Sequence, residues 1–160
     1  MTNSLSGMMF YLDTSALVKL YVTEVGSPWI LTLGNPPADI TIATARVTKV
    51  EAAAALANKY RSGGLSRTHY SNALQDLIHD FVDQYLLIEI DQALVDLAVE
   101  LTQRHKLRGY DALQLAAALT LNNVLIQTQF SPLTFIAADD DLLKAAQDEG
   151  LSTDNPNRHP

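Results

Sequence analysis

The chain has 160 residues, 48% of them hydrophobic and 18% charged, which suits one folded domain and excludes an intrinsically disordered protein. It has no cysteine and no apolar run near the ~20 residues that span a bilayer. These features exclude disulfides, thiolate metal sites and membrane spans, and they favour a cytoplasmic protein. The net charge of −7 argues against broad nonspecific adhesion to nucleic acid, but it is compatible with a site that attracts metal cations.

The amino-terminal part of the chain predicts one strand followed by short helices. An apolar run at residues 8–12 is typical of a buried strand, and Asp13 closes it. Short helices are expected at residues 15–22 and 26–33. The Gly-Asn-Pro-Pro content of residues 34–39 predicts a turn after the second of these helices.

The middle of the chain predicts two strands with two long helices between them. A strand is expected at residues 40–43, followed by a helix at 45–60 that contains four consecutive alanines. Ser66 is a preferred N-cap residue for the next helix, expected at 67–84. The apolar run LLIEI at residues 86–90 predicts another strand.

Two further helices are expected after that strand. Asp91 is predicted to cap a helix that reaches about His105 and carries leucine and alanine on one face. The segment YDALQLAAALTL at residues 110–121 predicts a helix that is apolar on most sides and therefore buried. Two asparagines at residues 122–123 predict a turn directly after this helix.

The carboxyl-terminal part is expected to complete one domain. Residues 124–135 fit either a strand or a loop before a final strand at 134–137, and a helix is expected at 141–149. We expect one domain over residues 1–152, followed by a polar tail at 153–160. Strands that alternate with helices imply an α/β layer structure with a largely parallel sheet, whose ligand site lies at the carboxyl ends of the strands.

Four acidic residues lie at the edges of apolar elements, where a parallel sheet would bring them together. They are Asp13, Glu51, Asp111 and Asp139. Each has an ordinary explanation alone, as a helix cap, a helix-dipole partner or an edge residue whose head reaches water. Clustered carboxylates repel one another unless a cation lies among them, and oxygen-only ligands select Mg²⁺ or Mn²⁺. The four acids therefore indicate a metal site suited to phosphodiester hydrolysis.

Four segments in order resemble the PIN-domain family, and specifically the VapC-like ribonuclease toxins of bacterial toxin–antitoxin operons. They are YLDTSALVKLY, KVEAAAAL, LRGYDALQLAAAL and FIAADDDLLKAAQDEGL, and together they cover about residues 9–151. The resemblance implies a three-layer α/β/α sandwich with a mainly parallel central sheet. It also implies RNA cleavage with Mg²⁺ or Mn²⁺, homodimerisation, and silencing by a cognate antitoxin protein.

The resemblance also implies roles for individual residues. Asp13, Glu51, Asp111 and Asp139 match the acidic quartet of the family, and Ser15 matches a small hydroxyl residue that supports the first aspartate. Asp13, Asp111 and Asp139 are expected to bind the metal directly or through water. Glu51 is expected to bind metal or to act as the general base, and the number of metal ions stays open.

Three basic residues near these motifs are candidates for binding the RNA backbone. They are Lys19, Arg46 and Arg108. A solvated surface position is the competing interpretation for each of them, because lysine and arginine are seldom buried.

The aspartate run at the last motif needs its own assignment, because a helix cap requires one aspartate and the run has three. We expect Asp139 at the metal, Asp141 as the N-cap with a supporting contact to the site, and Asp140 in solvent. The connection at residues 123–134 is longer than is usual in the family, so Asp141 stays the alternative fourth acid. Gln114 stands where many relatives have histidine, and no role is assigned to it.

Three other functions compete with a ribonuclease. An aspartyl-phosphate phosphatase needs a second aspartate two residues after Asp13, where this chain has Ser15. A receiver domain needs a late lysine at a strand end, and Lys144 falls within an expected helix. A PIN-like module that binds RNA or protein with little or no catalysis is the main alternative, and a metal-dependent ribonuclease assay separates it from an enzyme.

Overall fold

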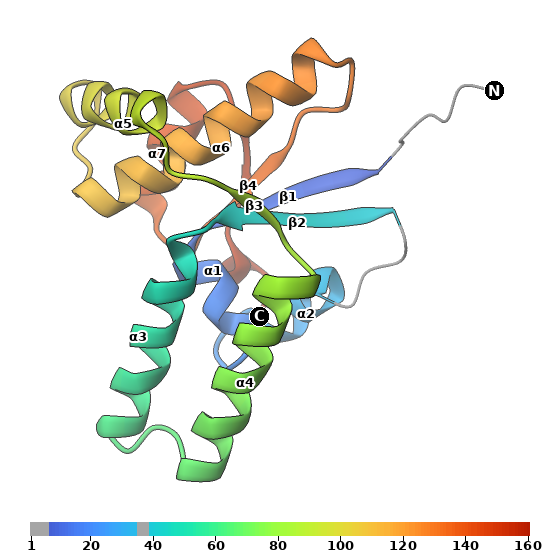
Figure 1. Ribbon diagram of the computed structural model, residues 1–160, viewed down its shortest axis with the longest axis vertical. Helices are drawn as coiled ribbons and strands as arrows, with labels where there is room; N and C mark the ends of the chain where they lie inside the picture. The colour runs from blue at the N-terminus through green and yellow to red at the C-terminus, as the bar shows by residue number, and fades with distance from the viewer. Residues whose placement is uncertain (1–6, 35–38) are drawn as a thin grey trace.

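A parallel sheet forms the middle layer of the molecule in the computed structural model, which describes residues 7–34 and 39–160 (Figure 1). The strand order is β3-β2-β1-β4-β5, and every neighbouring pair is parallel. The strands are β1 Met8–Leu12, β2 Ile40–Ala45, β3 Leu86–Ile88, β4 Thr134–Ile136 and β5 Ser152–Asp154. This arrangement confirms the expected α/β architecture with a parallel sheet.

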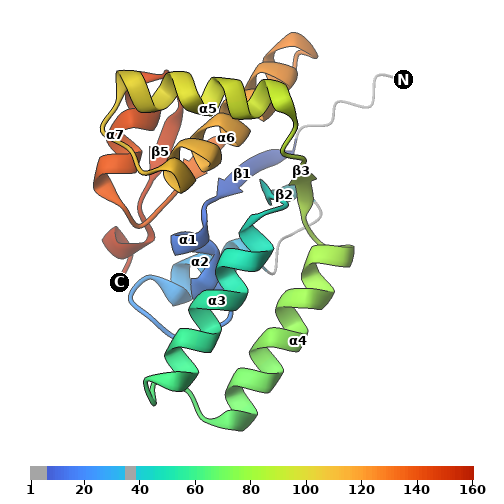
Figure 2. The ribbon, with the colours of Figure 1, turned by 60° about the vertical axis from the view of Figure 1, so that its left-hand side comes forward.

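Helices cover the sheet in two groups, and Figure 2 shows the α3–α4 hairpin at the end opposite α5 and α6. The helical elements, in chain order, are α1 Thr14–Leu17, η1 Val18–Leu20, α2 Ser27–Gly34, α3 Thr48–Arg61, α4 Arg67–Asp83, α5 Gln92–Arg104, α6 Gly109–Gln127, α7 Asp140–Asp148 and η2 Pro156–Arg158. None of the helices in the described part of the chain is both long and apolar enough to cross a membrane. The turn expected at 34–39 lies largely outside the described residues.

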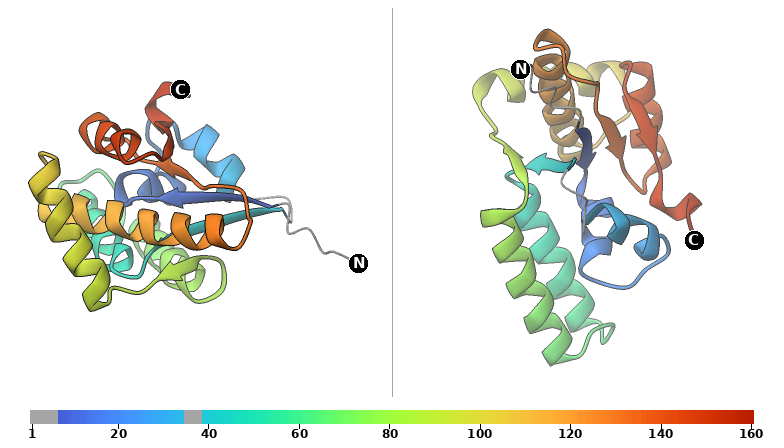
Figure 3. Two further views of the ribbon diagram at one scale, coloured as in Figure 1. Left: turned by 90° about the horizontal axis from the view of Figure 1, so that it is seen from above. Right: turned by 90° about the vertical axis from the view of Figure 1, so that its right-hand side faces the viewer.

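Each face of the sheet supports its own apolar core, because side chains alternate sides along a strand. Tyr11 and Phe135 point to one face, stack with ring centroids 5.5 Å apart, and pack with residues of α5, α6 and α7. Leu12, Ile42 and Ile136 point to the other face and pack with residues of α1, α2, α3 and α4. The left panel of Figure 3 shows the sheet edge-on between its covering helices. The sheet therefore lies between two helical layers, each with its own apolar core.

The start of α3 and the end of α6 lie several residues from their predicted positions. Helix α3 begins at Thr48 because β2 continues to Ala45, which pairs with Ile88 of β3. Helix α6 continues to Gln127, so the turn expected at 122–123 is wrong. The Asn122 side chain is buried and accepts a hydrogen bond of 3.0 Å from the backbone of Leu133, and this tertiary contact outweighs the turn preference of asparagine.

Two helix caps agree with the prediction. Ser66 caps α4 by accepting from the His69 backbone, and Asp91 caps α5 by accepting from the Leu94 backbone. The loop after α6 leads directly into β4, as in the second of the two expectations for residues 124–135.

Residues 153–160, which were expected to form a polar tail, pack against the domain, and Thr153 and Asp154 belong to β5. Residues of β5 pair with β4, and Asn155 and Pro156 are buried beside α2. His159 stacks on Trp29 with ring centroids 4.1 Å apart. Gly26 has a φ of +85°, and a Cβ there would collide with the Pro156 carbonyl. Polar composition misled the prediction because several of these side chains are hydrogen-bonded or stacked against the rest of the domain.

Candidate active site

The four predicted acidic residues line one cavity of about 440 Å³ at the carboxyl edge of the sheet. Asp13 directly follows β1, and Asp139 lies just beyond β4, the strand that pairs with β1. Glu51 comes from the first turn of α3, and Asp111 comes from the first turn of α6. The parallel topology thus brings together side chains that are up to 126 residues apart in the sequence (139 − 13).

Asp13 is both a helix cap and a buried carboxylate, since its side chain is 5% exposed. Its Oδ1 accepts hydrogen bonds of 3.0 Å from the Ala16 backbone and 2.7 Å from the Ser15 hydroxyl. Burial raises the pKa of Asp13 to about 7, and the charges of Asp111 and Glu51 add to the rise while the two hydrogen bonds oppose it. The contact expected for Ser15 is therefore present. Ser15 Oγ also accepts from the Ala138 backbone at 2.9 Å, which joins α1 to the loop carrying Asp139.

Glu51 and Asp111 are partly buried beside Asp13. Burial raises the pKa of Glu51, and the charge of Asp111 raises it further, against hydrogen bonds from Thr14 and Gln114 that lower it. Burial likewise raises the pKa of Asp111, followed by the charge of Asp139. These couplings mean that the carboxylates are close enough for each to disfavour ionisation of another.

Gln114 connects this acidic cluster to the core, although the sequence analysis gave it no role. It is 2% exposed and accepts a 2.7 Å hydrogen bond from the Tyr11 hydroxyl. Its Nε2 donates to Thr48 Oγ1 at 2.9 Å and makes longer contacts of 3.4 Å with Thr14 Oγ1 and Glu51 Oε2. The Thr14 hydroxyl also donates to Glu51 Oε2. The signal in the sequence was one amide within an otherwise apolar helix, a position that requires polar partners.

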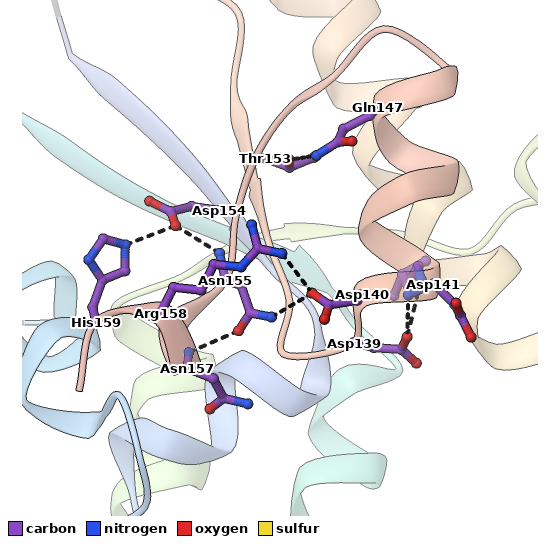
Figure 4. A network of polar contacts seen from close by, with 11 residues as sticks. Asp139, Asp140, Asp141, Gln147, Thr153, Asp154, Asn155, Asn157, Arg158 and His159 are labelled. Carbon is purple, nitrogen blue, oxygen red and sulfur yellow. Dashed lines mark hydrogen bonds and ion pairs between the residues drawn. The ribbon is translucent and has the colours of Figure 1, made fainter.

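The three aspartates divide their roles differently from the prediction (Figure 4). Asp139 is the N-cap of α7, with Oδ1 accepting from the backbones of Asp141 at 2.9 Å and Leu142 at 3.2 Å. The assignment of the cap to Asp141 is therefore wrong by two residues, because α7 begins already at Asp140. Asp139 also lines the cavity, whereas Asp141 is exposed.

Asp140 is exposed, as expected, with 72% of its side chain accessible, but it also makes contacts that were not predicted. Its Oδ1 accepts hydrogen bonds of 3.0 Å from Asn155 Nδ2 and 3.2 Å from Arg158 (Figure 4). These contacts tie the first turn of α7 to the segment after β5. The sequence did not indicate these contacts because the partners belong to residues that were expected to form a tail.

The basic candidates separate into one cavity residue and two surface residues. Lys19 lines the cavity, is 5% exposed, and pairs with Glu24 at 3.1 Å. Arg46 is exposed and pairs with Glu89, away from the cavity lining. Arg108 precedes α6 and lowers the pKa of Asp111 by its charge, but it does not line the cavity.

The donor set fits a hard divalent cation held partly through water. No three acidic or histidine side chains in residues 7–34 and 39–160 lie close enough together to form a complete cage for a metal. Mg²⁺ does not require one, since it keeps several waters and binds proteins through one or two carboxylates plus substrate phosphate. The cavity offers carboxylate and hydroxyl oxygens with neither cysteine nor histidine. A cation among these carboxylates would favour their charged forms, which burial disfavours.

Comparisons with known proteins agree with this architecture. A model of the PIN domain family matches residues 10–146 of the chain. Two curated relatives from Mycobacterium tuberculosis, ribonuclease VapC45 and ribonuclease VapC49, are each 33% identical to it over 115 residues. The matched region covers 72% of this chain and 78% of each relative.

Solved structures resemble the chain in fold over nearly its whole length. A chain in the complex of FitAB with an IR36 DNA fragment matches with a TM-score of 0.60 at 14% identity, covering 92% of this chain and 95% of that one. A chain of VapBC2 from Rickettsia felis, bound to a promoter DNA fragment, matches with a TM-score of 0.59 at 16% identity. The match covers 92% of this chain and 98% of that one.

Proposed function

The chain belongs to the PIN domain family, and from this premise we propose that it is a divalent-metal-dependent endoribonuclease, the toxin of a toxin–antitoxin pair. The observation that carries the proposal is the meeting of Asp13, Glu51, Asp111 and Asp139 in one cavity. Relatives that are 33% identical and named ribonucleases support RNA as the substrate.

In this proposal, Asp13, Asp111 and Asp139 hold Mg²⁺ or Mn²⁺, directly or through water. When bound, the metal supplies Lewis-acid activation of water and of the phosphodiester. Ser15 keeps Asp13 oriented through its 2.7 Å hydrogen bond, and the hydrogen bonds from the backbone of α7 to Asp139 Oδ1 leave its other oxygen for the site. The rigid caps therefore position two of the carboxylates before substrate arrives.

Glu51 is suited to act as the general base. Its Oε2 accepts from Thr14 and lies 3.4 Å from Gln114 Nε2, so Oε1 is left to accept a proton from the attacking water. Burial raises the pKa of Glu51, which makes its carboxylate a stronger proton acceptor.

The decisive experiment measures RNA cleavage by purified protein freed of any antitoxin. Total cellular RNA should be cleaved with Mg²⁺ or Mn²⁺, and EDTA should stop the reaction. Asp111→Ala should abolish cleavage, because Asp111 lines the cavity, whereas the control Asp141→Asn should retain it, because Asp141 is exposed. If the wild type cleaves nothing under either metal, the chain is instead a binding module.

We further propose that a cognate antitoxin silences this chain in the cell. The solved chains that share its fold come from complexes named VapBC2 and FitAB. Expression of the chain alone should slow bacterial growth, and co-expression of the product of the adjacent gene should restore it. Growth that is equally slow in both strains would contradict the pairing.

A further inference from the structure

A second charged cluster lines the same cavity as the four acids. It consists of Lys19, Glu24 and Lys59. Glu24 Oε2 lies 3.1 Å from Lys19 Nζ, and Glu24 Oε1 lies 2.6 Å from Lys59 Nζ, so one carboxylate bridges two ammonium groups. This basic cluster has a formal charge of +1, in a protein whose net charge is −7.

The basic cluster has a fixed position relative to the acids because each contributes one residue to the same face of α3. Glu51, Ala55 and Lys59 are spaced by four residues, and all three line the cavity. Eight residues of helix separate Glu51 from Lys59 by roughly 12 Å along the axis. Ala55 has only a methyl group, so little bulk stands between them. The cavity therefore runs along α3 from an acidic end to a basic end.

The two lysines have different roles within the basic cluster. The Lys19 side chain is 5% exposed, and a lysine so deeply buried requires a charged partner, which Glu24 supplies. Lys59 is 38% exposed, so its ammonium reaches solvent while Glu24 holds it in place. An ammonium has three donors, and Lys59 uses one on Glu24. Donors of Lys59 thus remain for a ligand in the cavity.

We propose that Lys59, held by Glu24, binds an RNA phosphate that neighbours the one cleaved at the acidic end. This inference rests on the proposed ribonuclease function and states where the substrate backbone lies, along α3. Four carboxylates repel a polyanion, and a protein with excess negative charge needs a local cation to retain one. Lysine acts as a point charge toward phosphate, which suits a contact that carries no base specificity.

A purely structural role of the basic cluster makes different predictions. In that case the cluster only joins the segment before α2 to α3, and removal of Lys59 affects stability alone. Ion pairs at this exposure contribute about 0–1 kcal/mol to folding. RNA affinity and its salt dependence would then be independent of residue 59. Measurements of RNA binding therefore separate the two roles.

The experiment measures binding of a labelled single-stranded RNA in EDTA, by fluorescence anisotropy, from about 50 to about 200 mM KCl. Lys59→Gln should reduce the slope of log K against log salt by about 0.7, the value for one lost phosphate contact on a single strand. Lys59→Arg should keep the slope. Lys144→Gln is the matched control, since Lys144 is exposed on α7 and pairs with Asp148 outside the cavity.

Equal salt slopes for Lys59→Gln and Lys144→Gln would overturn the inference. A wild-type chain that binds no RNA would overturn it as well.

These outcomes are distinguishable from failure of the ribonuclease proposal. If the wild type cleaves RNA with Mg²⁺ but the salt slope does not depend on residue 59, the proposed phosphate contact is refuted and the proposed ribonuclease function is supported. If RNA binding depends on Lys59 but no metal supports cleavage, the proposed phosphate contact is supported and the proposed ribonuclease function is refuted.

Discussion

Replacement of Gln114 by leucine should destabilise the protein substantially, although the two side chains are similar in size. The change leaves the Tyr11 hydroxyl without its 2.7 Å acceptor, and Tyr11 is fully buried. An unsatisfied buried hydroxyl costs about 1–3 kcal/mol, and loss of the 2.9 Å hydrogen bond to Thr48 adds about 1 kcal/mol. We therefore expect the free energy of unfolding to fall by about 2–4 kcal/mol. For a domain of this size, Tm should fall by roughly 4–16 °C.

Urea unfolding followed by circular dichroism measures this effect, and a double-mutant cycle with Tyr11→Phe identifies its cause. The double variant has no buried hydroxyl that lacks an acceptor, so it should be more stable than Gln114→Leu alone by about 1 kcal/mol. A Gln114→Leu protein within about 0.5 kcal/mol of the wild type would refute the reasoning. Strict additivity of the two single changes would show that Tyr11 and Gln114 are not coupled.

Two further predictions concern the acids themselves. Because burial raises the pKa of Asp13 to about 7 from 3.8, its contribution to stability is present below about pH 4 and is lost as pH rises through about 7. In EDTA, the Tm of the wild type should therefore fall over this pH range, and Asp13→Asn should reduce the fall. Millimolar Mg²⁺ should raise the wild-type Tm at pH 8. Identical pH profiles of Tm for the wild type and Asp13→Asn would contradict this prediction. Asp139→Asn should abolish RNA cleavage with little change in Tm, since asparagine caps a helix about as well as aspartate, and Asp141→Asn should change neither. The reverse pattern would make Asp141 the fourth acid.

The sequence was sufficient for the layer architecture and for the residues that meet at the site. Apolar runs ending at Asp13 and just before Asp139 fix strand ends, and parallel topology then places those ends at one edge. The same local logic found the caps at Ser66 and Asp91, because capping depends on only a few neighbouring residues.

The sequence did not predict which side chains from different elements contact one another in the folded protein. Gln114 has an obvious need for hydrogen bonds, but its partners Tyr11 and Thr48 come from other elements. The helical continuation through Asn122 depends on a contact with Leu133, which a turn preference does not anticipate. Asp140 likewise finds its partner Asn155 in a polar segment that composition alone assigns to solvent.

The central position of β1 has a consequence for protein synthesis. One neighbour of β1 is β2, but the other is β4, which follows it by more than a hundred residues. The Asp13 backbone donates to Ile136, and Ser15 accepts from Ala138, so the loop carrying Asp13 is held only once β4 has emerged from the ribosome. During translation, which proceeds at about 5–20 residues per second, a nascent chain therefore has an open β1 edge and an unfinished acidic cavity. The cavity can be completed only after β4 and Asp139 have been synthesised, because Asp139 forms part of its lining.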